Sequence, residues 1–128
     1  MISYMSERRF GYRVPLEMFL NEYVRDRLHR CVSTDLSESG LFVHKLITPP
    51  LRHPDAVQLE FELPGTSEVI WARGEVAYEK YDEHFHGTGV RLTGIASMHA
   101  RMLRDYVREK RKAQLRDLLD QIRRARYH

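Results

Sequence analysis

Three arginines lie close together in the stretch SERRFGYRVPL, residues 6–16. Arg8, Arg9 and Arg13 carry planar guanidinium groups, which bind phosphate or the O6/N7 edge of guanine through paired hydrogen bonds. Arg9 and Arg13 are separated by about 6 Å on a helix, and by at most about 14 Å on an extended chain. Both can therefore grip one compact anion. The alternative is a solvated charged leader whose arginines pair with neighbouring glutamates.

A second polar group of residues is the stretch TDLSESG, residues 34–40. On a strand, Asp35 and Ser37 point to one face and Leu36 to the other, so we expect Leu36 in the core and the polar pair at the rim. Gly40 permits a positive φ or the close approach of a ligand. A carboxylate accepts hydrogen bonds from the N–H groups of guanine, so both stretches together suit a ligand with guanine and phosphate. The alternative is a β-turn built by Asx and Ser hydrogen bonding.

The elements that must position these residues are strands followed by a helix. Apolar residues alternate with polar ones from Val57 to Leu63, which predicts a half-buried strand. Strands with turn signals between them predict an antiparallel barrel or sandwich; we place them at 14–24, 28–37, 40–46, 56–63, 68–81 and 88–95. Residues 97–126 lack Gly and Pro and have apolar residues at helical spacing. This predicts one long helix, or two helices broken near 110–113.

Composition indicates one globular domain with an uneven charge. The 128 residues carry a net charge of +3. Residues 97–128 hold ten Lys or Arg against four Asp or Glu, a net +6, and the preceding part carries −3. A single cysteine, Cys31, cannot form an intramolecular disulfide. Because no apolar membrane span or secretory signal is evident, we expect a cytoplasmic protein.

The two polar stretches resemble the signature of a known family. Arg9-x-x-x-Arg13 followed by Asp35-x-Ser37-x-x-Gly40 is similar to the RxxxR and DxSxxG motifs of the PilZ domain, over about residues 7–108. The resemblance implies a mainly β fold, a six-stranded antiparallel PilZ-type barrel with a long C-terminal helix. We accordingly divide the chain into an N-terminal ligand-binding segment (1–13), the barrel (14–96) and the helix (97–128).

The resemblance also implies a bacterial receptor for the second messenger cyclic di-GMP. By position, Arg9 and Arg13 would contact phosphate and guanine, Asp35 and Ser37 would hydrogen-bond a guanine, and Gly40 would leave room for it. We expect ligand binding to order the N-terminal segment and so change a surface that an unknown protein partner recognises. An interaction module of the same fold without nucleotide dependence is the first alternative.

Two further residues extend the implied site. Arg8 stands where the family favours an intercalated pair of ligand molecules, because its guanidinium can stack on a second guanine. This implies two molecules of cyclic di-GMP per chain. Tyr78 stands where relatives place an aromatic side chain, which could stack on a base or simply belong to the barrel wall.

Other reactive residue types lack the pattern of a catalytic or metal site. His84, Phe85 and His86 fall in a segment that reads as a connection between strands, without further ligands at zinc-site spacing. Cys31 lies mid-strand without the signature of a nucleophile. We expect no enzyme activity, no metal and no cofactor.

The sequence leaves the role of the basic helix open. It could be a solvated face with ion pairs such as Arg101–Asp105 and Arg116–Asp120. It could instead form a homodimer or dock a partner through the apolar residues Leu115, Leu118, Leu119 and Ile122. Contact with nucleic acid is the least favoured of these alternatives.

Overall fold

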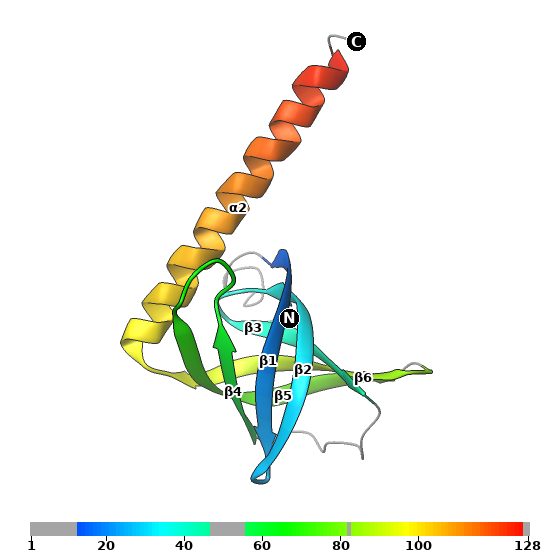
Figure 1. The fold of residues 1–128 in the computed structure, drawn as a ribbon, viewed down its shortest axis with the longest axis vertical. Helices are drawn as coiled ribbons and strands as arrows, with labels where there is room; N and C mark the ends of the chain where they lie inside the picture. The colour runs from blue at the N-terminus through cyan, green and yellow to red at the C-terminus, as the bar shows by residue number, and fades with distance from the viewer. Residues whose placement is uncertain (1–12, 47–55, 82, 127–128) are drawn as a thin grey trace, which may run out of the picture.

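Six strands and one helix are seen in the computed structural model, which describes residues 13–46, 56–81 and 83–126. All neighbouring strands are antiparallel and close into a barrel in the order β1-β2-β3-β6-β5-β4 (Figure 1). The predicted six-stranded barrel with a C-terminal helix is thereby confirmed. The elements are β1 (Val14–Val24), β2 (Arg27–Leu36), β3 (Gly40–Leu46), β4 (Ala56–Glu62), β5 (Val69–Tyr81), β6 (Phe85–Ile95) and α2 (Ser97–Arg126).

The core consists of the inward-facing side chains of the strands and one face of α2. The alternation predicted from Val57 to Leu63 is confirmed, because its four apolar side chains are at most 2% exposed. Leu103 and Val107 of α2 are equally buried. The helix is fixed by Tyr106, whose hydroxyl donates to the Pro64 carbonyl at 2.7 Å. This helix therefore completes the core beside the turn that joins β4 and β5.

β2 does not keep one alternation along its length. Cys31 and Ser33 point inward, the pairing with β3 then shifts between Ser33 and Asp35, and Leu36 is the next buried residue. Such a bulge changes which side chains face the core. The burial of Leu36 was predicted, but Ser37 follows the end of the strand and is only 5% exposed. The prediction that Ser37 stays at the rim of a strand is therefore wrong.

The connection between β5 and β6 is shorter than predicted. β6 begins at Phe85, so Phe85 and His86 belong to the strand, and His86 is fully buried against Tyr81. The two rings are parallel, with centroids 4.5 Å apart. Pairing continues to the end of the hairpin, which projects from the barrel (Figure 1).

α2 is one continuous helix, which decides between the two predicted forms. Its ion pairs join Arg104 to Asp105 and Lys112 to Glu109. The predicted pairs Arg101–Asp105 and Arg116–Asp120 are not formed within the described part of the helix. Its second half extends away from the barrel (Figure 1). Along its described length α2 is too polar to cross a membrane.

A buried ion pair connects two strands inside the barrel. Lys45 Nζ of β3 lies 2.6 Å from Glu22 Oε1 of β1, and both side chains are almost completely buried. Glu22 Oε2 has no hydrogen-bond partner among the described residues. A charge removed from water in this way is tolerated only while its partner is present.

We predict that Lys45→Met lowers the free energy of unfolding by about 3–5 kcal/mol, because Glu22 is left buried without its counter-ion. The double variant Glu22→Leu/Lys45→Met should regain most of that loss, since both charges are then absent. Urea denaturation measures both variants. Equal stability of the single and double variants would contradict the prediction.

Candidate functional site

The structure brings the two polar stretches together at the beginning of β1. Arg13 Nη1 lies 3.6 Å from Asp35 Oδ2, and the two side chains are 55% and 27% exposed. The contact follows from the β1–β2 ladder, which pairs Val14 with Leu36 and Pro15 with Asp35. Arg8 and Arg9 lie outside the described residues. One predicted cation and the predicted carboxylate therefore meet on the outer wall of the barrel.

The two carboxylate oxygens of Asp35 have different surroundings. Its Oδ1 accepts a hydrogen bond from the Phe42 backbone N–H at 3.1 Å, and its Oδ2 faces Arg13. The bulge in β2 frees this N–H for the side chain, because it shifts the ladder just before Asp35. The carboxylate is thus held in a fixed orientation while it stays accessible to hydrogen-bond donors.

Ser37 builds the turn between β2 and β3. Its Oγ donates to the Gly40 carbonyl at 2.9 Å, and accepts from the backbone N–H groups of Gly40 and Ser39 at 3.0 and 3.2 Å. The donor hydrogen and both acceptor lone pairs of the hydroxyl are therefore occupied. The local turn considered from the sequence is present, and direct contact between Ser37 and a ligand stays a prediction.

Gly40 is required by the neighbouring strand. A Cβ at this position would overlap the carbonyl oxygen of Val90 in β6, and the φ angle of Gly40 is not in the left-handed region. Of the two possibilities that the sequence left open for Gly40, the positive φ is not adopted. The close approach is real, but it is made by the backbone of β6. Its effect is to bring the β2–β3 turn against β6, where Leu92 N–H donates to Ser39 O at 2.8 Å.

The strand register extends the site in a row across the barrel wall. Asp35 of β2 pairs with Phe42 of β3, Phe42 pairs with Gly89 of β6, and Gly89 pairs with Tyr78 of β5. Directly paired residues point to the same face, so the three side chains lie on one outer surface. Three strand spacings separate Asp35 from Tyr78, about 14 Å. The structure therefore places Tyr78 in line with Asp35.

The sequence reasoning named Tyr78 but missed two of its neighbours, Phe42 within the row and Lys80 beside it. The rings of Phe42 and Tyr78 lie 5.8 Å apart, over Gly89 and the nearby Gly87. Lys80 Nζ lies 5.9 and 6.0 Å from the two ring centroids. We call Phe42, Tyr78 and Lys80 the aromatic platform. The only sequence signal was Gly-x-Gly on a strand, because two glycines without side chains leave room for rings from both neighbouring strands.

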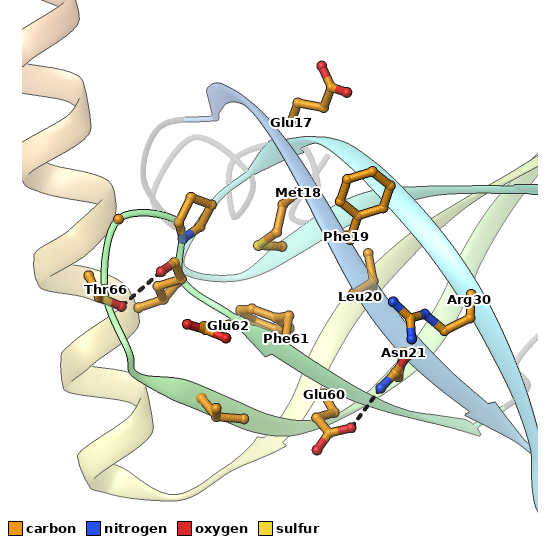
Figure 2. Close-up of a pocket in the computed structure, with 14 residues that line it drawn as sticks. Glu17, Met18, Phe19, Leu20, Asn21, Arg30, Glu60, Phe61, Glu62 and Thr66 are labelled. Atoms are coloured by element: carbon orange, nitrogen blue, oxygen red, sulfur yellow. Dashed lines mark hydrogen bonds between the residues drawn. The ribbon is translucent and has the colours of Figure 1, made fainter.

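Apart from this outer surface, the barrel has a groove between β1 and β4 (Figure 2). These strands pair only from Leu20 to Tyr23, so they diverge beyond Leu20 and leave a groove of about 530 Å³. Glu17, Glu60 and Glu62 line it, and Arg30 is the one basic residue among the described residues of its lining. This excess of carboxylates disfavours a phosphate ligand. We call it the β1–β4 groove.

The remaining reactive residues do not form a site in the described part of the chain. Burial raises the pKa of the Cys31 thiol to about 12, which keeps it protonated and unreactive. Burial, together with the nearby Lys45 ammonium, lowers the pKa of His86, so the ring stays neutral at neutral pH. No group of three His, Cys, Asp or Glu residues is arranged there to hold a metal ion.

We predict that Gly40→Ala lowers the free energy of unfolding by about 1–3 kcal/mol, because the new methyl group meets the backbone of β6. Gly94→Ala in β6 is the control, since its Cβ would touch only the Arg73 side chain of the paired strand β5, at 3.4 Å. Urea denaturation compares the two. A loss no larger for Gly40→Ala than for Gly94→Ala would refute this account of Gly40.

The comparisons with known proteins agree with this geometry. The family model described as PilZ domain matches residues 7–109. No curated protein sequence matches the chain.

Solved structures with the same fold come from several bacteria. The Bacillus subtilis inhibitor of motility (MotI/DgrA) superposes with a TM-score of 0.71 and 15% identity, over 79% of this chain and 49% of that one. The chain therefore spans about half the length of that relative. The PilZ domain of Escherichia coli YcgR with c-di-GMP gives a TM-score of 0.63 and 16% identity, over 85% of this chain and 95% of that one. Borreliella burgdorferi PlzA in complex with c-di-GMP gives 0.58 and 14%, over 83% and 43%.

Proposed function

Because the chain belongs to the PilZ domain family, we propose that it is a receptor for cyclic di-GMP and not a catalyst. The observation that carries the proposal is the contact of Arg13 with Asp35, which joins the two halves of the family signature on one surface. Structures of related PilZ proteins that contain c-di-GMP support the choice of ligand.

Each part of the surface suits a different part of the ligand. Arg13 supplies an exposed guanidinium for phosphate or for the guanine O6/N7 edge. Asp35 Oδ2 supplies an acceptor for guanine N–H groups. Arg9 and Arg8, which precede the described residues, complete the basic side of the site by their position in the sequence.

The aromatic platform offers a place for the second guanine. Tyr78 presents a partly exposed ring in line with Asp35, and Lys80 adds a positive charge beside it. A base stacked on an aromatic ring contributes about 1–3 kcal/mol. We assign Tyr78 to the ligand-binding surface and Ser37 and Gly40 to its support, with direct ligand contact by Ser37 as the sequence prediction.

The output of binding passes through the first residues of β1. Arg13 is followed by the buried Val14 and then by Pro15, whose carbonyl accepts a hydrogen bond from Gln114 Nε2 of α2 at 3.2 Å. A ligand whose phosphate attracts Arg13 acts two residues away from this hydrogen bond between β1 and α2. We propose that ordering of the N-terminal segment thereby changes the surface beside α2 that a protein partner recognises.

We predict that Arg13→Ala weakens cyclic di-GMP binding about 10- to 150-fold, because a charge-assisted hydrogen bond contributes about 1.5–3 kcal/mol. Loss of both Arg9 and Arg13 should abolish measurable affinity. Titration calorimetry of the whole chain measures both variants. Arg30→Ala is the matched control, since Arg30 is exposed but lines the β1–β4 groove. The receptor proposal fails if the wild type gives no heat at tens of micromolar.

We predict that Arg8 sets the stoichiometry of the ligand. Its guanidinium can stack on the guanine of a second molecule, so wild type should saturate near two nucleotides per chain and Arg8→Ala near one. The same calorimetric titrations provide both plateaus. A wild-type plateau near one would contradict the role given to Arg8 while leaving the receptor function intact.

A further inference from the structure

The second half of α2 carries an apolar stripe without a partner among the described residues of its own chain. Leu115, Leu118, Leu119 and Ile122 lie on one face by their helical spacing and are 43–55% exposed. Gln114 makes the hydrogen bond to Pro15, and the helix beyond it runs clear of the barrel (Figure 1). A helix of about 12 residues without packing is marginal in water. We call Leu115–Arg126 the α2 tip. Its apolar stripe needs another surface to bury it.

The charges beside the stripe define the surface that fits it. At about 3.6 residues per turn, Lys112, Arg116 and Arg123 lie along one border of the stripe, while Asp117 and Asp120 lie on the opposite side of the helix. Two antiparallel tips would bring these basic borders against each other, and two parallel tips would oppose them to glutamines. The matching surface is therefore apolar with acidic residues around it.

The β1–β4 groove is such a surface. Phe19 on its wall is 69% exposed, an unusual exposure for a large aromatic side chain, and Val69 is also exposed. Glu17 and Glu62 line the groove and form no ion pair with any described residue, whereas Glu60 accepts a hydrogen bond from Asn21 at 2.9 Å (Figure 2). An apolar strip with two available carboxylates complements the stripe and its basic border.

An α2 tip that fills the groove must belong to another molecule. The base of α2 lies at the rim of the groove, where Tyr106 bonds to Pro64, but the tip of the same helix points away (Figure 1). In a two-fold pair, each tip can lie over the groove of the other chain, antiparallel to the base of that chain's helix. Both grooves are then filled and the assembly is closed.

We propose that this protein forms a reciprocal dimer in which the α2 tip of each chain docks in the β1–β4 groove of the other. Leu118 and Leu119 cover Phe19 and Val69, and Arg116 and Arg123 face Glu17 and Glu62. The interface leaves the surface of Asp35 and the aromatic platform uncovered. Formation of the dimer therefore does not require bound cyclic di-GMP.

Sedimentation velocity of the full chain at about 100 µM and about 50 mM salt tests the dimer, and higher salt should weaken it by screening the charges. Leu118→Ser in the tip and Phe19→Ser in the groove should each raise the dimer dissociation constant at least about 10-fold. Met98→Ser and Leu28→Ser are the controls, because both residues are exposed apolar residues outside the two surfaces. Far-UV circular dichroism verifies that each variant is folded.

Exchange of charges identifies the pairing of tip with groove. Arg116→Glu/Arg123→Glu and Glu17→Lys/Glu62→Lys should each give monomers, and one chain carrying all four changes should dimerise again. A dimer that depends on Leu118 but not on Phe19 would overturn the proposal in favour of paired helices. A wild-type monomer would also overturn it. If that monomer bound vesicles of phosphatidylcholine with phosphatidylserine, the stripe would be a membrane contact instead.

Discussion

The short ladder between β1 and β4 is the constraint on which the other features depend. It closes the barrel over only four residue pairs, from Leu20 to Tyr23. The first half of β1 is therefore paired on one side only, with β2, and this pairing brings Arg13 to Asp35. The same divergence leaves the β1–β4 groove, while Leu103 and Val107 of α2 add to the core.

The surface of Arg13 and Asp35 and the glutamate-lined groove are thereby separate parts of the barrel. The arginine-bearing start of β1 faces the end of β2, and the glutamates of β1 and β4 face the groove. The first surface offers a guanidinium to an anionic group, whereas the carboxylates of the second disfavour one. The C-terminal residues carry a basic excess on α2, and hydrogen bonds of Tyr106 and Gln114 attach this helix to the barrel.

Features that arise from local periodicity were predictable from the sequence, and those that depend on strand register were not. The alternation from Val57 to Leu63 is enough to predict β4, and the long run without Gly or Pro is enough to predict α2. The bulge before Asp35 needs the partner strand, so the burial of Ser37 could not be seen. The aromatic platform joins residues of β3 and β5 over glycines of β6. Spacing along the sequence does not predict this contact, because the strand register sets it. Gly40 was recognised as necessary for a different reason, because the backbone that approaches it comes from Val90, far along the chain.

The Arg13–Asp35 contact is strong enough to position the site and weak enough to be exchanged. At 3.6 Å and with half of the arginine side chain exposed, such a pair contributes at most about 1 kcal/mol. Asp35 does not depend on it for orientation, because the Phe42 N–H holds its other oxygen. Under the proposed function, a ligand would therefore bind Arg13 through its phosphate and donate guanine N–H groups to Asp35. Each partner would then form a charge-assisted hydrogen bond, and these are stronger than the exposed ion pair they replace. Asp35 is thus preorganised on the β2 side by a contact that does not involve Arg13.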